Sequence, residues 1–285
     1  MSDFRKACVI GWPITHSRSP LIHKYWLNAC HLPGDYTREA VKPDEFPDFA
    51  HNMRDSGYCG GNVTLPHKEQ ALALCDRSTA LARRLGAVNT LWFEGARLHG
   101  DNTDVGGFLA NLDEQAPGWD RNVRRAVLLG AGGAARAVLA GLAERKIAEV
   151  VVVNRSLERA RRLVDEARDW GFDRLTADVF DPRGRNLANA DLLIHSTSLG
   201  MTGQPRLELD LSFLPDSALV SDIVYAPLET TLLQAARGRG LRTSSGLGML
   251  LHQAAPGFAH WFGVTPEVTA ELRALIAADV ERGAP

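Results

Sequence analysis

The stretch AVLLGAGGAA, residues 126–135, decides the fold that we expect for this chain. Four apolar residues indicate a buried strand, and the small residues after them open a helical segment. The spacing Gly130-x-Gly132-x-x-Ala135 in a strand–loop–helix context is the dinucleotide-binding fingerprint. Its glycines permit a tight turn and a close backbone approach to a pyrophosphate, and its small last residue lets the helix pack on the strand. A plain connecting turn is the alternative, but the context favours binding of a dinucleotide. The residues expected to hold its phosphates are Gly130, Ala131, Gly132, Gly133 and Ala134.

The end of the next strand indicates which dinucleotide is bound. Residues 150–153 are four valines, which is typical of a strand buried on both faces. NAD sites usually carry Asp or Glu about 20 residues after the glycines. Here the strand ends in Asn154 and Arg155, and Arg159 follows one helical turn later. Two guanidinium groups can flank a 2′-phosphate. Two solvated arginines in an arginine-rich chain are the alternative, but their position favours NADP (NADPH).

Length and composition predict a two-domain α/β protein. The 285 residues are 45% hydrophobic, enough for two cores, and apolar runs alternate with helical segments as in a mostly parallel sheet. A net charge of −2 predicts no nucleic-acid or membrane partner. No apolar run reaches the roughly 20 residues of a membrane span, and the N-terminus has no apolar signal core. Four cysteines without a C-x-x-C pair predict reduced thiols, no metal site and a cytoplasmic location.

The coarse order of elements follows from the apolar runs. Strands are expected over residues 7–11, 36–41, 60–64, 88–93, 97–100, 126–129, 150–153, 192–194 and 219–224. Helices are expected over residues 21–30, 44–55, 66–75 and 247–262, with one beginning near Asp104 and a last one from about Pro266. Aspartate is a good N-cap, so capping is one expected role of Asp104.

A lone lysine stands at one predicted strand-to-helix junction, the stretch NVTLPHK of residues 62–68. Asn62 and Thr64 alternate with apolar residues and therefore project from one strand face. Pro66 suits the first position of a helix, which puts Lys68 in the first turn. Only five of the 32 basic residues are lysine. A lysine can release and recover a proton, whereas an arginine cannot. A solvated surface lysine is the alternative.

Four further polar motifs complete a recognisable set: ITHSRSP at 14–20, GAVNT at 86–90, GDNTD at 100–104 and GLGMLLHQ at 246–253. Together with residues 62–68, 130–135 and 154–156, and in this order, they resemble the shikimate dehydrogenase family over nearly the whole chain. The resemblance implies an N-terminal α/β substrate domain of residues 1–104 that is completed by C-terminal helices within 246–285. Residues 105–245 would form a Rossmann-type NADP-binding domain, with the active site in the cleft between the two.

The resemblance implies an oxidoreductase that reversibly reduces 3-dehydroshikimate to shikimate with NADPH, in the shikimate pathway of aromatic amino-acid biosynthesis. The protein would be a monomer or a homodimer. Two alternatives stay open. One is a paralogue that acts on quinate or an aminoshikimate analogue, with NAD as a possible cofactor. The other is a non-catalytic nucleotide-sensing protein on the same fold, which would not need a proton-transfer pair.

The resemblance also implies roles for single residues. Lys68 and Asp104 would be the acid/base pair, and Met249 would contact the nicotinamide unless it is a core methionine. Ser19 has helix capping as an alternative role. The residues expected to bind the substrate are Ser17, Ser19, Thr64, Asn89, Tyr225 and Gln253. Two positions depart from the family pattern, Ser245 and His67, and we interpret His67 as structural.

Overall fold

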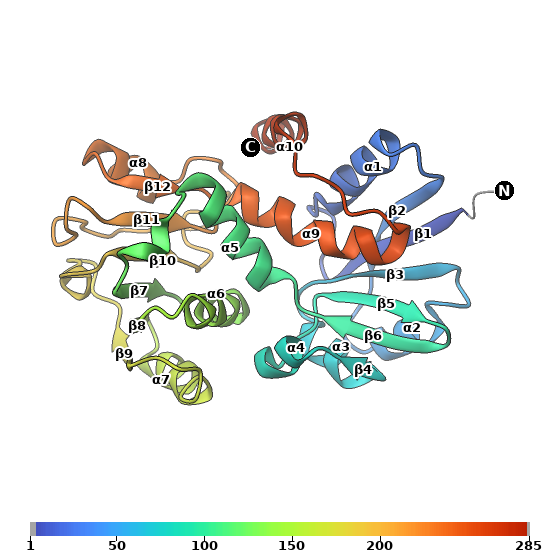
Figure 1. Cartoon of the computed structure of the whole chain (residues 1–285), viewed down its shortest axis with the longest axis horizontal. Helices are drawn as coiled ribbons and strands as arrows, with labels where there is room; N and C mark the ends of the chain where they lie inside the picture. Colours follow the sequence, from blue (N-terminus) through green and yellow to red (C-terminus); the bar gives the residue numbers. More distant parts are fainter. Residues whose placement is uncertain (1–3, 284–285) are drawn as a thin grey trace. The chain divides into compact units, whose positions relative to one another are not determined.

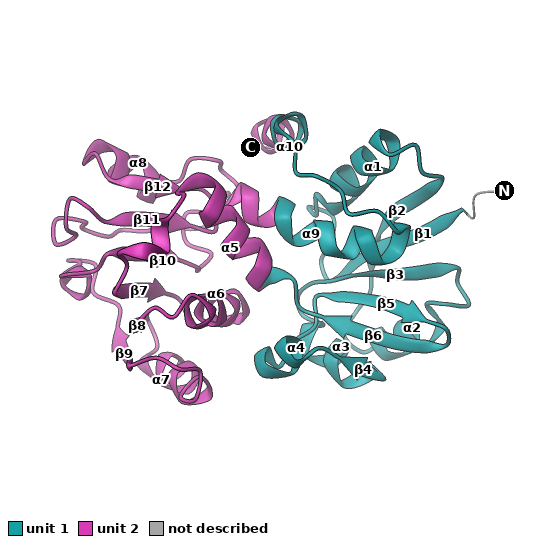
Figure 2. Cartoon of the chain, in the orientation of Figure 1, with its two compact units in different colours: residues 1–104, 251–276 teal, residues 105–250, 277–285 magenta. Residues whose placement is uncertain are grey.

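The computed structural model describes residues 4–283 and divides into two compact units. Unit 1 comprises Met1–Asp104 and Leu251–Ile276, and unit 2 comprises Val105–Leu250 and Ala277–Pro285 (Figure 2). The chain therefore leaves unit 1 after Asp104 and re-enters it within one long helix. The expected domains, including what each of them binds, stay a prediction, and each unit is described by itself.

Unit 1 is built on a six-stranded mixed sheet with the order β2-β1-β3-β5-β6-β4 (Figure 1). The first three strands in this order are parallel, and β5 and β6 form an antiparallel hairpin beside β3. The strands are β1 Arg5–Gly11, β2 Gly34–Ala40, β3 Tyr58–Val63, β4 Arg77–Ser78, β5 Thr90–Glu94 and β6 Arg97–Asp101. The helices are α1 Ser19–Ala29, α2 Phe46–Asn52, α3 Lys68–Leu74, α4 Ala80–Leu85 and the unit 1 part of α9 Leu247–Phe262.

Two different cores cover the faces of this sheet. Hydrophobic packing on one face joins Cys8 and Ile10 of β1 with Phe46 and Met53. Aromatic packing involves β2, α1 and α9: the ring of Tyr36 stacks on the ring of His23 at 4.0 Å, and both lie near Trp261. Gly60 of β3 has no room for a side chain there, because a Cβ would lie 2.3 Å from Nε1 of Trp261.

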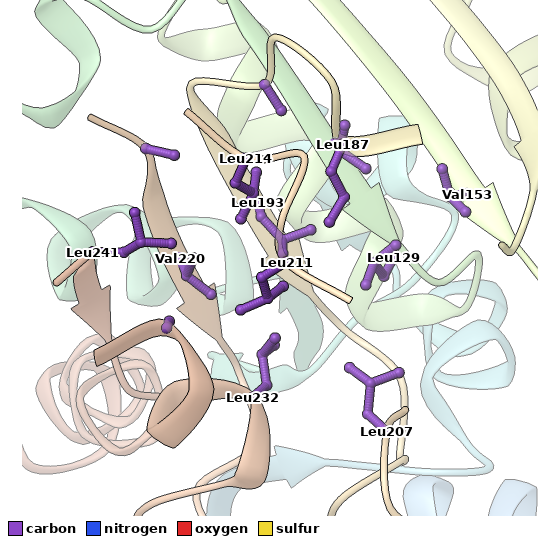
Figure 3. Packing of buried hydrophobic residues seen from close by; sticks show 14 of the residues in the cluster. Leu129, Val153, Leu187, Leu193, Leu207, Leu211, Leu214, Val220, Leu232 and Leu241 are labelled. Carbon is purple, nitrogen blue, oxygen red and sulfur yellow. The ribbon is translucent and has the colours of Figure 1, made fainter. Parts of the chain in front are cut away.

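Unit 2 is built on a six-stranded, fully parallel sheet with the order β12-β11-β10-β7-β8-β9. This order reverses between β7 and β10, which is the arrangement of doubly wound nucleotide-binding folds. Its core includes Leu129, Leu193 and Val220, which pack together as Figure 3 shows. The strands are β7 Arg125–Leu129, β8 Glu149–Asn154, β9 Arg174–Val179, β10 Leu192–His195, β11 Leu219–Asp222 and β12 Arg242–Ser244. The helices are α5 Asp104–Gln115, whose first residue is counted with unit 1, α6 Gly133–Glu144, α7 Leu157–Glu166, α8 Thr231–Gly238 and residues 247–250 of α9. Helix α10 Ala270–Arg282 is divided, with residues 270–276 counted with unit 1 and the rest with unit 2.

The prediction of an α/β chain with parallel-rich sheets is confirmed, while several element boundaries were wrong. Pro66 does not occupy the first helical position: it follows a cis peptide bond, His67 is the N-cap, and α3 begins at Lys68. The last helix begins at Ala270 rather than near Pro266. Strand β4 has only two residues, too few to produce a periodic signal.

Candidate active site

Lys68 and Asp104 form an ion pair at the starts of α3 and α5. The Nζ of Lys68 lies 2.5 Å from Oδ2 of Asp104, and the two side chains are 24% and 14% exposed. The other carboxylate oxygen accepts a 2.8 Å hydrogen bond from Nδ2 of Asn89. Asp104 is therefore held by Asn89 and in turn orients the ammonium group. A half-buried ammonium with a fixed orientation can donate a proton to an oxygen placed beside it.

Asn89 is the centre of this arrangement. Its side chain is 2% exposed, and its Oδ1 accepts hydrogen bonds from the backbone N–H of Thr103 and the hydroxyl of Thr90, both at 2.9 Å. The Nδ2 group lies 3.5 Å from Oε1 of Gln253. The Thr103 hydroxyl donates to the backbone carbonyl of Gln253 at 2.8 Å. The structure thus brings together four residues that the sequence separates widely: Lys68, Asn89, Asp104 and Gln253.

Ser17 lies in the loop that leads into α1, and Ser19 is the first residue of that helix. The Ser17 hydroxyl donates to the Ser19 hydroxyl at 3.3 Å, and the Ser19 backbone N–H points to Ser17 Oγ at 3.4 Å. The capping alternative for Ser19 was wrong, because Arg18 is the N-cap of α1 and no side chain caps it. Nε of Arg38 donates to the Ser17 carbonyl at 2.8 Å and fixes the loop.

Tyr36 and Asn62 are a pair that sequence reasoning did not assign to the site. Both are buried, and the Tyr36 hydroxyl donates to Oδ1 of Asn62 at 2.7 Å. Burial raises the pKa of Tyr36 well above its ordinary value, and interactions with Asn62 and Ser19 oppose this rise. The alternation in residues 62–68 marked Asn62 as a polar residue on a strand face, but nothing in the sequence marked Tyr36 as a partner of Asn62.

Thr64 and His67 follow Asn62 and differ in their surroundings. The Thr64 methyl faces Gly11, and its hydroxyl makes no hydrogen bond within residues 4–283, so it is available to a ligand. His67 is 1% exposed; its ring stacks on Phe46 at 4.5 Å, and Nε2 lies 2.8 Å from the Val41 carbonyl. Burial lowers the pKa of His67. This agrees with the interpretation of His67 as structural.

The glycine-rich loop of unit 2 leaves its backbone open at the start of α6. Gly130 has φ +116°, and a Cβ there would lie 2.5 Å from Oγ of Ser196. A Cβ added at Gly132 or Gly133 would meet nothing within 4 Å, so the backbone at the start of α6 is open. Ala135 is fully buried in α6. The loop therefore combines a turn that requires glycine with free backbone N–H groups at a helix start, which suits phosphate.

Two cationic side chains follow the end of β8: Arg155 comes directly after the strand, and Arg159 lies in the first turn of α7. The side chain of Asn154 is hydrogen-bonded within the connection to α7: its Nδ2 donates to the Ser156 carbonyl at 3.0 Å. The Ser156 hydroxyl caps α7. Arg155 and Arg159 are exposed, and neither has an ion-pair partner among the described residues. Nearby Arg162, by contrast, pairs with Glu158 at 3.1 Å. The residues present thus fit a dinucleotide with a 2′-phosphate.

Tyr225 and Met249 belong to unit 2, and both are half-buried. Tyr225 follows β11 by three residues, and Met249 lies in the first turn of α9. Their expected contacts with substrate and nicotinamide stay predictions. Ser245 has a structural role, because Gln115 and Asn111 both bind its backbone carbonyl at 2.9 Å. Within the described part of the chain, no group of three His, Cys, Asp or Glu side chains is placed to hold a metal ion.

Three family models match successive parts of the chain. Residues 9–91 match the shikimate dehydrogenase substrate binding domain. Residues 113–202 match the shikimate / quinate 5-dehydrogenase model, and residues 246–276 match the shikimate 5′-dehydrogenase C-terminal domain. The seven sequence motifs all lie within or beside these matched regions.

Complete proteins show the same similarity over almost their entire lengths. A shikimate dehydrogenase (NADP(+)) of Rhodopseudomonas palustris is 57% identical over 274 residues, which cover 96% of each chain. The solved shikimate 5-dehydrogenase of Thermus thermophilus, in complex with NADP(H) and shikimate, is 32% identical with a TM-score of 0.83; the match covers 98% of this chain and 99% of that one. Quinate dehydrogenase of Corynebacterium glutamicum in complex with NAD is 30% identical with a TM-score of 0.87, and the match covers 97% and 99%.

Proposed function

The chain belongs to the shikimate dehydrogenase family, and on that premise we propose that it reversibly reduces 3-dehydroshikimate to shikimate with NADPH. One observation carries the proposal beyond family membership. The Lys68–Asp104 ion pair is present at 2.5 Å, and Asn89 fixes its geometry. A protein that only senses a nucleotide would not need a proton donor built in this way, so the pair favours an enzyme.

The chemistry assigned to Lys68 is proton transfer. Bound NADPH supplies the hydride to the carbonyl carbon of the substrate. The Lys68 ammonium donates a hydrogen bond to the carbonyl oxygen, stabilises the growing negative charge and transfers its proton. Asp104 holds the ammonium in place and accepts a hydrogen bond from a neighbouring substrate hydroxyl. Because the Lys68 side chain is 24% exposed, solvent can restore its proton after each turnover.

Most of the proposed substrate contacts come from neutral side chains of unit 1. Ser17 and Ser19 bind the carboxylate, and the free hydroxyl of Thr64 binds a ring hydroxyl. Asn89 and Gln253 also contact the ring of the substrate. Because Asn89 is hydrogen-bonded to Thr90, Thr103 and Asp104, its main role is to orient Asp104. Tyr225 is assigned a second contact with the carboxylate.

The cofactor is NADP rather than NAD on this proposal. Backbone N–H groups at the start of α6 hold the pyrophosphate, and Gly132 and Gly133 leave room for it. Arg155 and Arg159 hold the 2′-phosphate, because both are exposed and no carboxylate of the described chain neutralises them. Met249 contacts the nicotinamide. A cytoplasmic location is part of the proposal; the four cysteines are free, and no described helix is long and apolar enough to cross a membrane.

Quinate is the second candidate substrate, because a quinate dehydrogenase has the same fold with a TM-score of 0.87. A rate assay that follows oxidation of NADPH and NADH with 3-dehydroshikimate and 3-dehydroquinate decides between them. We expect the largest kcat/KM for NADPH with 3-dehydroshikimate. A larger kcat/KM for 3-dehydroquinate, or for NADH, would overturn the substrate or the cofactor assignment, respectively.

A further inference from the structure

A buried histidine–aspartate pair in unit 2 has no part in the proton transfer described above. His195 is the last residue of β10 and Asp222 the last residue of β11, and the two are register partners in the parallel sheet. Nδ1 of His195 lies 2.9 Å from Oδ1 of Asp222, with the side chains 0% and 1% exposed. Burying a charged or polar group without a hydrogen-bond partner costs free energy, so each polar atom of this pair is expected to have a partner.

Both carboxylate oxygens of Asp222 accept hydrogen bonds from further groups. Oδ1 also accepts the backbone N–H of Val224 at 3.0 Å, and Oδ2 accepts the Thr230 hydroxyl at 2.6 Å. An ionised carboxylate only accepts hydrogen bonds, so Nδ1 of His195 carries the proton that points to Asp222. In the neutral ring, Nε2 is then an acceptor.

The other ring nitrogen of His195, Nε2, faces a hydroxyl in the loop after β10. It lies 2.5 Å from Oγ1 of Thr197, whose oxygen also accepts the backbone N–H of Leu199 at 3.1 Å. The order carboxylate, imidazole, hydroxyl is that of an acyl-transfer triad. Here, however, the Thr197 oxygen also accepts the backbone N–H of Leu199, so the arrangement links His195 to the loop of residues 196–199.

This loop lies directly against the first glycine of the phosphate-binding turn. A Cβ on Gly130 would lie 2.5 Å from Oγ of Ser196 and 3.2 Å from Cγ2 of Thr197. The hydroxyl and the backbone N–H of Ser196 both donate to the carbonyl of Leu129, at 2.7 Å and 2.8 Å. Strands β7 and β10 are the neighbours between which the strand order reverses, and ligands of such sheets bind there.

We propose that His195 and Asp222 are positioning residues for the dinucleotide. They hold Thr197, and through it the loop of residues 196–199 that packs against the Gly130 turn. The inference rests on the NADP-binding function proposed above. It assigns no chemical step to either residue. It predicts that loss of the His195–Thr197 hydrogen bond weakens cofactor binding while substrate binding in unit 1 is unchanged.

The test compares Thr197→Val, which removes the hydroxyl at similar volume, with Thr197→Ser, which keeps it. Thr176→Val on strand β9 is the matched control, because Thr176 is a half-buried threonine of the same sheet. The dissociation constant of NADPH is measured by fluorescence titration. For Thr197→Val it should rise about three- to tenfold, the effect of one lost neutral hydrogen bond. Thr197→Ser and Thr176→Val should stay within about twofold of wild type, a change below the effect of one hydrogen bond.

A second variant, His195→Asn, tests the same hydrogen bond from its other partner. Asparagine keeps an amide donor toward Asp222 but is too short to reach Thr197. We expect its NADPH dissociation constant to rise as for Thr197→Val, with no further rise in the double variant, because both changes remove the same hydrogen bond. The KM for shikimate at saturating NADP should be unchanged in every folded variant.

The outcomes separate this inference from the function on which it rests. Failure of the wild-type protein to bind NADPH would overturn the proposed function itself. Tight NADPH binding by wild type and equally tight binding by Thr197→Val would overturn only the positioning role. That role is also overturned if Thr197→Ser fails to restore affinity, if Thr176→Val weakens binding as much, or if the effects of His195→Asn and Thr197→Val simply add. Should His195→Asn fail to fold, the Thr197 series alone still decides.

Discussion

Tyr36 on β2 donates a 2.7 Å hydrogen bond to Asn62 on β3, across the intervening strand β1. Asn62 in turn donates to the backbone carbonyl of Asn89 at 3.3 Å, and Asn89 holds Asp104. Burial raises the pKa of the Tyr36 hydroxyl, and on the other side of Tyr36 the side chain of Ser19 opposes this rise, so the two groups are near each other. A buried polar connection therefore runs from the serines proposed to bind the carboxylate to the carboxylate that orients Lys68.

Tyr36→Phe is expected to destabilise the protein and weaken substrate binding. The phenyl ring keeps the packing against His23 but leaves Oδ1 of Asn62 without its donor, which costs about 1–3 kcal/mol in a buried site. The free energy of unfolding and the KM for shikimate should both show the change. Tyr58→Phe is the control, because the Tyr58 hydroxyl binds Glu39 outside this connection. Equal KM values for wild type and Tyr36→Phe would refute the link to the serines.

Lys68→Ala should lose most turnover while NADPH binds as before, because the lysine lies in unit 1 and the proposed phosphate site in unit 2. General acid catalysis is typically worth about 10²–10⁴ in rate, so kcat should fall at least about 100-fold. Lys68→Arg should fail nearly as badly, because a guanidinium does not release a proton at working pH. Asp104→Asn should also lose much of kcat, since Lys68 loses the charge that orients it.

Steady-state rates and NADPH titrations on the same preparations separate these effects. Lys24→Arg is the matched control, because Lys24 is also ion-paired, to Asp35 at 2.9 Å, but is half exposed and has no proposed role. It should keep wild-type kcat. Near wild-type kcat in Lys68→Arg would make the lysine an electrostatic anchor and rule out proton transfer from it.

The fold could be predicted, and residues of the candidate site could be proposed, where the signal is local. The glycine spacing after β7 and the valine run of β8 each occupy a few consecutive residues, and both have the expected structure. Tyr36 and the pair of His195 and Asp222 could not be assigned, because their partners are set by sheet register between distant segments. A buried tyrosine with a hydrogen bond looks the same in sequence as one without.

Ser17→Ala combined with Ser19→Ala should raise the KM for shikimate far more than it lowers kcat. Two hydrogen bonds to a charged group contribute about 3–6 kcal/mol if fully made, so the KM should rise at least about 100-fold unless water replaces them. The single variants should show smaller increases. Ser212→Ala, at an exposed serine of unit 2, is the control and should leave the KM unchanged. An unchanged KM in the double variant would remove both serines from the carboxylate site.

Arg155→Ala combined with Asn154→Asp should move cofactor preference from NADP toward NAD. The carboxylate repels the 2′-phosphate and accepts a hydrogen bond from the 2′-hydroxyl of NAD, while one guanidinium is lost. The ratio of kcat/KM for the two cofactors measures the shift. Arg162→Ala controls for charge, because Arg162 is exposed but already paired with Glu158. A wild-type protein that prefers NAD would contradict our interpretation of Arg155 and Arg159.

His23 should make unit 1 sensitive to acid. The ring is fully buried, neither nitrogen has a hydrogen-bond partner among residues 4–283, and burial lowers the pKa of His23 to about 3. This folded-state value lies below the ordinary 6.5. Between the two values the unfolded chain binds a proton at His23 and the folded chain does not. The stabilising contribution is therefore complete above about pH 6.5 and is lost as the pH falls, by about 1.4 kcal/mol per pH unit.

The measurement is urea unfolding of wild type and His23→Phe at several pH values from neutral to about pH 5, within the window that the linkage relation defines. Phenylalanine keeps the stack on Tyr36 and does not titrate, so the difference in unfolding free energy between the two proteins isolates His23. It should shift in favour of His23→Phe as the pH falls. His51→Phe, at an exposed histidine of α2, should keep the wild-type pH dependence. Parallel curves for wild type and His23→Phe would mean that His23 takes up a proton in the folded protein as easily as in the unfolded chain.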